Sequence, residues 1–244
     1  MDHIGMDLGK VKSQVCILTD SGELLHRRIP TERERLMEFF GNRPKARILV
    51  EASTETEWVA RCLEEAGHEV IVGDPNYAPM YSQRSRRVKT DQRDAEALAE
   101  ACRLGGYRPA HRTSDKQRHV RGLLGVREAL VRTRARWIAL IRSLLRREGI
   151  RVRSGWSKSF VTRVEELALP AHLIEEVAPL LACMAHLNER IELLDRQVTE
   201  LARKDEVARR LMTTPGVGSV IALSFVATLD GVDRFRGPHQ VEAS

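Results

Sequence analysis

Four acidic side chains stand where the chain could use them to hold a metal ion. Asp7 lies near the end of a first apolar run, in Ile-Gly-Met-Asp-Leu-Gly, and Glu51 ends a later one, in Ile-Leu-Val-Glu-Ala-Ser. Asp91 and Asp94 open a helical pattern, in Lys-Thr-Asp-Gln-Arg-Asp-Ala-Glu. Carboxylates that end buried strands cost free energy unless something binds them. Because sites built only from oxygen ligands suit Mg²⁺ or Mn²⁺, we predict that these four residues are both metal ligands and catalytic residues.

Several carboxylates in one site are suited to chemistry at a phosphodiester. Two cations held close together can activate a nucleophile and stabilise the leaving oxygen. Taken alone, Asp91 could be only a helix-start residue, and each of the other acids could be a surface charge. The combination of two strand-end acids with a later Asp-x-x-Asp pair favours a metal site. Glu55 and Glu57 are nearby competitors, which we interpret as first-turn charges of the following helix.

The elements expected before residue 75 would bring these acids together. Apolar runs and helical spacing predict, in chain order, strands at 4–8, 14–19 and 24–29, a helix at 31–41, a strand at 47–51, a helix at 57–66 and a strand at 69–72. This order matches the ribonuclease H fold, in which the first and fourth strands lie side by side. Asp7 and Glu51 would then be neighbours. A helix from about residue 90 to 104 would present Asp91 and Asp94 on one face, at its positive end.

Positive charge is concentrated in one stretch of the chain. Residues 111–163 carry 15 Lys and Arg against 3 Asp and Glu, whereas residues 1–110 carry 17 against 18 and residues 164–244 carry 8 against 13. Nearly all of the excess is arginine, which pairs with phosphate in a bidentate way. A solvated helix face could also be charged, but so one-sided an excess favours a polyanionic partner.

The region after residue 114 is expected to be helical. Leu123, Leu130, Trp137 and Leu144 recur every seven residues, and residues 149–158 break the pattern. A second long helix is predicted from about residue 180 to 212. Its apolar seam alternates in steps of four and three, which is typical of a coiled coil; the seam is Leu180, Met184, Leu187, Ile191, Leu194, Val198 and Leu201. Two such helices suggest an antiparallel hairpin, and the seam could be either the hairpin core or a dimer interface.

A glycine-rich turn, Thr-Thr-Pro-Gly-Val-Gly, precedes a last apolar helix at residues 220–229. Pro-Gly-x-Gly before a helix resembles a helix-hairpin-helix turn, whose backbone amides approach a DNA phosphate, although an ordinary turn into a buried helix would look the same. Our predicted nucleic-acid contacts therefore lie in this turn, in the basic block and in the loop before residue 90; they are Arg84, Arg86, Arg87, Lys89, Arg132, Arg134, Arg136, Arg142, Arg146, Arg147, Gly216 and Gly218.

Other classes of protein are disfavoured by what the sequence lacks. No apolar run reaches the roughly 20 residues that span a bilayer, and the chain enters its first strand without a signal segment. The four cysteines are scattered and the eight histidines form no ligand-like pair, so we expect reduced thiols in a cytoplasmic protein and no zinc site. His3, His26 and His68 are expected at the surface or in strands.

Four motifs together resemble the DEDD transposases of insertion sequences, in the IS110 class related to the Piv-type invertases. They are Gly-Met-Asp-Leu-Gly-Lys at 5–10, Val-Glu-Ala-Ser at 50–53, Lys-Thr-Asp-Gln-Arg-Asp-Ala at 89–95 and Pro-Gly-Val-Gly at 215–218. The resemblance spans essentially the whole chain and implies a RuvC-like catalytic domain at residues 1–110, an Arg-rich coiled-coil region at 111–209 and the start of a helical C-terminal transposase domain at 210–244. The fold class is thus α/β, ribonuclease-H-like, followed by a long helical hairpin.

The resemblance also implies an activity and partners. Members of the family cut and rejoin DNA, and some are directed by a structured bridge RNA. We therefore expect a metal-dependent recombinase that binds DNA and a structured guide RNA and forms a homo-oligomer through the coiled coil. The family's C-terminal domain continues to a Ser-Gly motif whose serine is the covalent nucleophile. Neither Ser219 nor Ser244 matches that context, so the resemblance implies a shortened transposase, deficient in strand transfer.

Three other functions stay open at this point. A RuvC-like structure-selective nuclease needs the same four acids and no serine. A non-catalytic nucleic-acid-binding remnant would need only the basic block. An actin-like sugar kinase or ATPase would use the Gly-Met-Asp-Leu-Gly-Lys segment as a phosphate loop, but we find no second such loop, and the basic block would then have no role.

Overall fold

The computed structural model describes residues 1–81 and 90–242. The chain divides into two units, Met1–Arg112 and Thr113–Ser244. The predicted loop contacts Arg84, Arg86, Arg87 and Lys89 lie outside the described residues. The predicted division at residues 110 and 209 stays a prediction, and the second unit contains both the helical hairpin and the helices that follow it.

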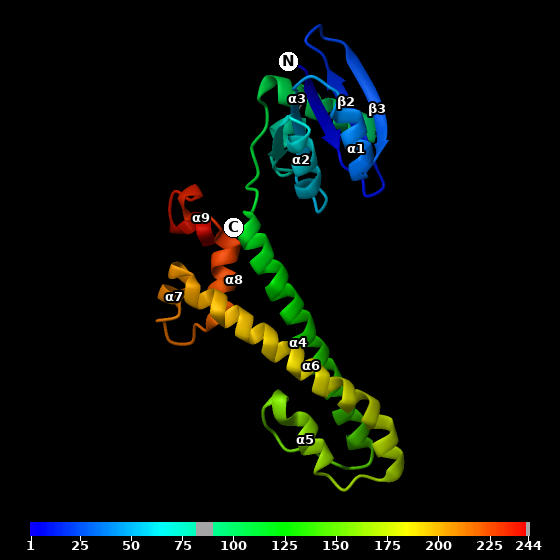
Figure 1. The fold of residues 1–244 in the computed structure, drawn as a ribbon, viewed down its shortest axis with the longest axis vertical. Coiled ribbons are helices and arrows are strands. Elements are labelled where there is room, and N and C mark those ends of the chain that lie inside the picture. The colour runs from blue at the N-terminus through cyan, green and yellow to red at the C-terminus, as the bar shows by residue number, and fades with distance from the viewer. Residues whose placement is uncertain (82–89, 243–244) are drawn as a thin grey trace. The chain divides into compact units, whose positions relative to one another are not determined.

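The first unit is built on a five-stranded mixed sheet (Figure 1). Its strands are β1 (His3–Asp7), β2 (Lys12–Leu18), β3 (Leu24–Pro30), β4 (Arg47–Glu51) and β5 (Glu69–Gly73). The order across the sheet is β3-β2-β1-β4-β5, with β1 antiparallel to β2 and parallel to β4. All five predicted strands are therefore present, and the predicted adjacency of the first and fourth strands is confirmed.

Helices cover both faces of this sheet. The helices are α1 (Arg33–Phe40), α2 (Thr56–Glu65) and α3 (Asp91–Leu104), with a short 3-10 helix, η1 (Ala78–Tyr81), before α3. Because side chains alternate along a strand, Ile4 and Met6 of β1 enter a core with α1 and α2, while Gly5 between them faces α3. The faces thus differ at β1: α1 and α2 pack on its apolar side chains, whereas α3 packs on its bare backbone and on side chains of the neighbouring strands.

His68 is the exception to the predicted placement of the histidines. It is 5% exposed, and its Nδ1 accepts a hydrogen bond from the Ala46 amide at 3.2 Å while Nε2 lies 3.0 Å from the Phe40 carbonyl. With Nδ1 as the acceptor, Nε2 donates to that carbonyl. The prediction of a surface or strand position for His68 was wrong, because this ring ties together two chain segments that are more than 20 residues away.

All four cysteines are free of disulfide bonds in the structure. Cys16, Cys62 and Cys102 are buried and Cys183 is exposed. Burial raises the pKa of the Cys16 and Cys102 thiols to about 12, so both stay protonated, and unreactive, at neutral pH.

The second unit is an antiparallel helical hairpin with further helices at one end (Figure 1). Its arms are α4 (Asp115–Arg147) and α6 (Ala171–Lys204); η2 (Ser157–Ser159) and α5 (Phe160–Glu165) lie in the connection. Ile141 and Leu145 late in α4 pack with Leu173 and Val177 early in α6. At the other end α4 and α6 share a core with α7 (Glu206–Leu211) and α8 (Ser219–Leu229), and η3 (Val232–Arg234) and α9 (Pro238–Glu242) follow.

The second arm of the hairpin differs from its predicted bounds. It begins nine residues earlier than expected, with Pro179 inside the helix, and ends at Lys204 rather than near 212. Asp205 ends it, because its backbone is extended and its carboxylate accepts a hydrogen bond from the Ala208 amide, which starts α7. Of the predicted seam, Met184, Leu187, Ile191 and Val198 are buried within this one chain, so the seam forms a hairpin core. None of the described helices is both long and apolar enough to cross a membrane.

Candidate metal centre

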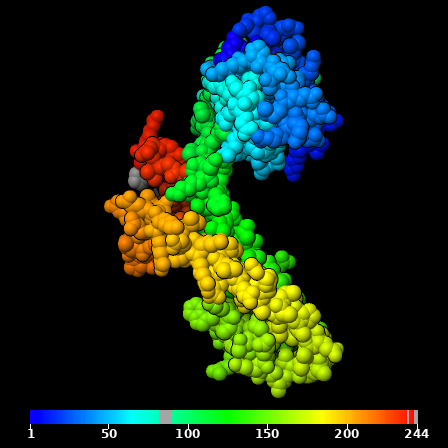
Figure 2. All heavy atoms as spheres, in the orientation of Figure 1, coloured from blue at the N-terminus to red at the C-terminus, as the bar shows by residue number. Residues whose placement is uncertain are grey.

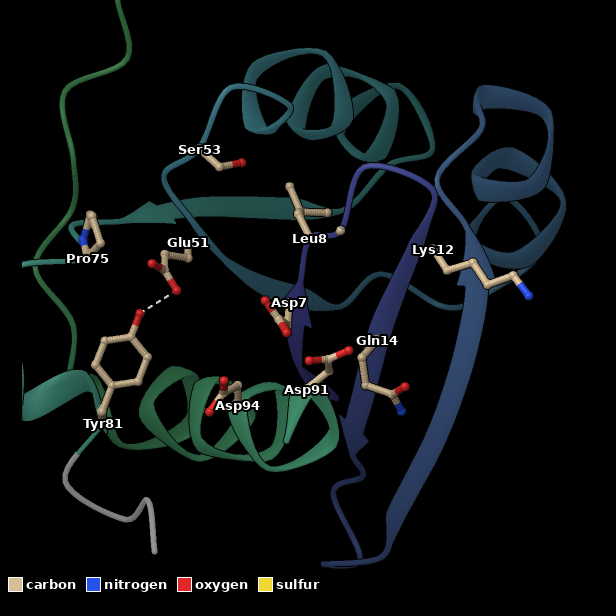
Figure 3. Close-up of a pocket in the computed structure, with 11 residues that line it drawn as sticks. Asp7, Leu8, Lys12, Gln14, Glu51, Ser53, Pro75, Tyr81, Asp91 and Asp94 are labelled. Carbon is tan, nitrogen blue, oxygen red and sulfur yellow. Dashed lines mark hydrogen bonds between the residues drawn. The ribbon is translucent and has the colours of Figure 1, made fainter. Parts of the chain in front are cut away.

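The four predicted acids line one open cleft of about 630 Å³ in the first unit. They come from the end of β1, the end of β4 and the first turn of α3. Figure 3 shows their carboxylates surrounding a common space. The cleft is completed by Leu8, Gly9, Lys12, Gln14, Ser53, Pro75 and Tyr81.

Asp7 is positioned by the turn that joins β1 to β2. A Cβ on Gly9 would lie 2.2 Å from the Lys12 carbonyl oxygen, so the turn closes only with glycine there. The Gly9 carbonyl accepts a hydrogen bond from the Thr31 hydroxyl at 2.8 Å, and that hydroxyl lies 2.7 Å from the buried Ser13 hydroxyl. These contacts fix the backbone that follows Asp7.

Glu51 is held from its backbone and from its carboxylate. The Thr56 hydroxyl donates to the Glu51 carbonyl at 2.6 Å and accepts from the Ser53 amide at 2.8 Å, which pins the turn after β4. The Tyr81 hydroxyl donates to Glu51 Oε2 at 2.5 Å (Figure 3). Hydrogen bonds to charged acceptors are the short and strong kind, so Tyr81 restricts where this carboxylate can lie.

Asp91 and Asp94 are presented by the start of α3. The helix begins after Thr90, whose hydroxyl accepts a hydrogen bond from the Arg93 amide, as in an N-cap. Asp94 is 8% exposed and Asp91 is exposed. A Cβ on Gly5 would lie 2.1 Å from the Ala95 carbonyl oxygen and 2.2 Å from the Ala99 nitrogen. The bare backbone of Gly5 therefore lets α3 sit directly on β1, next to Asp7.

The chemistry of this set suits a hard divalent cation. All four acids offer carboxylate oxygens, which Mg²⁺ and Mn²⁺ prefer, and one of them, Asp94, is nearly buried. Within residues 1–81 and 90–242, no three acidic, histidine or cysteine side chains already lie close enough together to hold an ion.

The competing acids of the β4–α2 segment have other partners. Glu55 accepts a hydrogen bond from the Trp58 indole at 2.7 Å. Glu57 accepts hydrogen bonds from Arg61 and Arg112; burial alone would raise its pKa, but the two guanidiniums lower it overall. Both residues stand at the start of α2, as predicted.

Several predicted nucleic-acid contacts of the basic block also make contacts within the hairpin. Arg134 donates to the Asn188 side chain at 3.0 Å, and burial lowers its pKa. Arg147 donates to Glu176 at 2.8 Å and Arg132 pairs with Glu128 at 2.5 Å. Arg136 is exposed. Some arginines of the block therefore stabilise the hairpin, while others, such as Arg136, are exposed to solvent. Sequence spacing alone did not distinguish the two groups.

The glycine-rich turn joins α7 to α8. Gly216 has a φ of +85°, which favours glycine, and Gly218 precedes the first residue of α8. The Val217 amide donates to the Thr214 carbonyl at 3.1 Å, closing the turn between α7 and α8. Contact of Gly216 and Gly218 with nucleic acid stays a prediction.

Comparison with known proteins places this geometry in a family. A family model described as "Transposase", for the DEDD transposases of IS110 elements, matches residues 4–149, more than half of the chain. The chain belongs to the IS110 family of DEDD transposases. The match begins in β1 and includes all four acids of the cleft.

Relatives of this IS110-family chain carry the same name. It is 31% identical to the transposase for insertion sequence element IS1328 of Yersinia enterocolitica, over 92% of this chain and 66% of that protein. It is 30% identical to a probable family 20 transposase of Pseudomonas aeruginosa, over 100% of this chain and 72% of that protein. The chain therefore spans about two thirds of the length of these relatives. The RuvC structure of Thermus thermophilus is also similar, with a TM-score of 0.33 and 16% identity over 45% of this chain and all of RuvC.

Sequence reasoning missed four polar residues of the cleft. Lys12, Gln14, Ser53 and Tyr81 line it, but none was predicted as a site residue. Lys12 and Gln14 lie two residues apart in β2, so they project to the same side of the strand. The antiparallel pairing of β1 with β2, which sets Gln14 opposite Asp7, was the available signal for Gln14. Tyr81 lies 30 residues from Glu51 and had no such signal.

Proposed function

We propose that this chain is a metal-dependent DNA transposase whose four acids, Asp7, Glu51, Asp91 and Asp94, hold Mg²⁺ or Mn²⁺ and support DNA strand cleavage. The observation that carries the proposal is the convergence on one cleft of acids from β1, β4 and the start of α3. Membership of the IS110 family supports DNA as the substrate. We also propose that the arginine-rich hairpin binds a guide RNA and that the chain forms a homo-oligomer.

Each residue of the cleft has a definable part in the reaction. The four carboxylates would bind the metal, and the bound metal would lower the barrier to attack at a phosphodiester. Tyr81 would fix one Glu51 oxygen and leave the other to face the cleft. Lys12 would supply a positive charge at the rim, where a DNA phosphate enters. The open shape of the cleft suits a polymer that must pass through it.

A second candidate is a RuvC-like structure-selective nuclease, which the same four acids favour equally. The two functions differ in their products. Hydrolysis leaves free DNA ends, whereas transposition joins an end to a new strand. Product analysis therefore separates them.

The test is cleavage of labelled supercoiled and branched DNA by the full chain, with and without Mg²⁺. We expect Mg²⁺-dependent products from the unaltered protein and only background from Asp7→Asn and Glu51→Gln. Glu38→Gln is the matched control, because Glu38 is an exposed carboxylate of α1, outside the cleft, that pairs with Arg35 one turn away. Cleavage that survives the Asp7 and Glu51 substitutions would refute the proposal and leave a nucleic-acid-binding function.

A further inference from the structure

The connection between the two hairpin arms contains a pocket lined by arginine. The tip pocket, of about 340 Å³, is lined by Arg142, Arg146, Ile150, Arg151, Val152 and Ser154. It combines three guanidiniums with no carboxylate. Within the part of the chain that the structure describes, none of these three arginines forms an ion pair. In Figure 2 the yellow-green residues of this tip lie on the surface at the end of the hairpin.

One of these arginines is fixed in place. The Arg142 guanidinium lies 5.6 Å from the centre of the Phe160 ring, in cation–π geometry. Phe160 itself is fully buried in the hairpin core. Arg142 Nε is buried and has no hydrogen-bond partner among the described residues. The contact with Phe160 therefore holds this wall of the pocket in place.

A large exposed aromatic residue, Trp156, follows two residues after Ser154, which lines the pocket. Trp156 is 86% exposed, more than any other exposed large apolar residue among those described. Its backbone is nevertheless held, because its carbonyl accepts hydrogen bonds from the Ser159 amide, the Ser159 hydroxyl and the Arg163 guanidinium, at 3.0–3.2 Å. The fold thus fixes the backbone and presents the indole to solvent.

These two features lie within reach of one nucleotide. Ser154 lines the pocket and is two residues from Trp156, so their Cα atoms are at most about 7.6 Å apart. Arginine side chains bind phosphate, and exposed aromatic rings stack on unpaired bases. We propose that the tip of the hairpin binds an unpaired nucleotide of single-stranded RNA or DNA, with the base stacked on Trp156 and a phosphate in the tip pocket.

A purely structural explanation covers only part of this arrangement. Basic residues in the last turn of a helix interact favourably with its negative end, which would account for Arg146 in α4. It does not account for Arg151, which lies beyond the helix, nor for an exposed indole on a fixed backbone. The inference rests on the proposed nucleic-acid function, but not on any chemistry in the cleft.

The test is fluorescence anisotropy of the full chain with labelled single-stranded RNA, single-stranded DNA and duplex DNA over a salt series. We expect Trp156→Ala to weaken single-strand binding by roughly one to two orders of magnitude, since stacking of one base contributes that much. Trp156→Phe, which keeps an aromatic ring, should retain most of the single-strand affinity. The salt slope should be unchanged by either substitution, because neither removes a phosphate contact. Whichever single strand, RNA or DNA, binds more tightly and depends on Trp156 is the nucleic acid that the tip recognises.

The pocket makes a separate prediction in the same assay. Arg151→Ala should lower the salt slope by about 0.7, the value for one phosphate contact on a single strand. Arg190→Ala is the control, because Arg190 is an exposed arginine on α6 outside the pocket. Tryptophan emission should also be quenched on binding in the unaltered protein and not in Trp156→Phe.

The outcomes separate this inference from the function of the cleft. If Trp156→Ala binds single strands as tightly as the unaltered protein, or if duplex DNA shows the same dependence on Trp156, the inference is overturned. Single-strand binding that depends on Trp156 supports it even when no DNA cleavage is detected. Mg²⁺-dependent cleavage together with unaltered binding by Trp156→Ala would uphold the proposed function and reject the nucleotide site.

Discussion

Replacing Gly5 with alanine perturbs the contact that places half of the acidic cluster. Gly5 lies in the middle of β1, and the backbone of α3 crosses directly over it. An added Cβ would stand 2.1 Å from the Ala95 carbonyl oxygen and 2.2 Å from the Ala99 nitrogen. Both atoms belong to the helix backbone, so no side-chain rotation can relieve the clash.

The size of the effect follows from these distances. Ordinary contacts of a Cβ atom begin near 3.4 Å and essentially none is shorter than 3.0 Å, so α3 must retreat from β1 by about 1 Å. Overpacking of this kind costs about 1–3 kcal/mol, and in a unit of this size each kcal/mol lowers Tm by about 4 °C or more. A displacement of about 1 Å at a catalytic group can also reduce the rate about a hundredfold.

The assay is thermal unfolding combined with Mg²⁺-dependent cleavage below the unfolding transition. We expect Gly5→Ala to lose stability and to lose activity even where it remains folded, because Asp91 and Asp94 move with α3. Gly106→Ala is the control within the same unit, since its Cβ would meet only an ordinary contact at 3.9 Å. A Gly5→Ala protein with unchanged Tm and full cleavage would refute the reasoning.

Three further outcomes follow from single contacts. Tyr81→Phe removes the hydrogen bond to Glu51 but keeps the ring, so we expect about a 10–100-fold loss of Mg²⁺ affinity with unchanged folding; an unaltered Mg²⁺ titration would contradict this. His68→Leu leaves a buried amide and a buried carbonyl without their partner and should cost on the order of 2–4 kcal/mol in urea unfolding, whereas a stable variant would show that water replaces the ring. In the folded protein a thiol reagent at pH 8 should label Cys183 alone, and rapid labelling of a second cysteine would show that the sheet opens.

The parts of the fold that follow from local pattern were predictable. Apolar runs located the five strands, and their order implied that β1 and β4 are neighbours, which is why Asp7 and Glu51 could be placed together. The helical pattern placed the start of α3 near residue 90, and the structure has Thr90 as its N-cap. Each of these features depends on residues that are close in sequence, or on strand pairing that follows from the order of the elements.

Contacts between distant segments were not predictable in the same way. The approach of α3 to Gly5 joins residues about 90 positions apart, and nothing in the local sequence of either marks it. The end of α6 was misplaced because a second helix, α7, follows after a single residue, Asp205, whose capping carboxylate ends α6 and starts α7. Pro179 likewise hid the true start of α6, since proline inside a helix is costly and usually marks an end.

The central claim is that four carboxylates from three elements form one metal site, and Mn²⁺ titration calorimetry tests it most directly. We predict that the unaltered chain binds Mn²⁺, that Asp7→Asn and Asp94→Asn each weaken binding strongly, and that Glu38→Gln does not. Mg²⁺ should compete for the same site. If both aspartate variants bound Mn²⁺ as tightly as the unaltered chain, the claim would be contradicted and the cleft would not be a metal site.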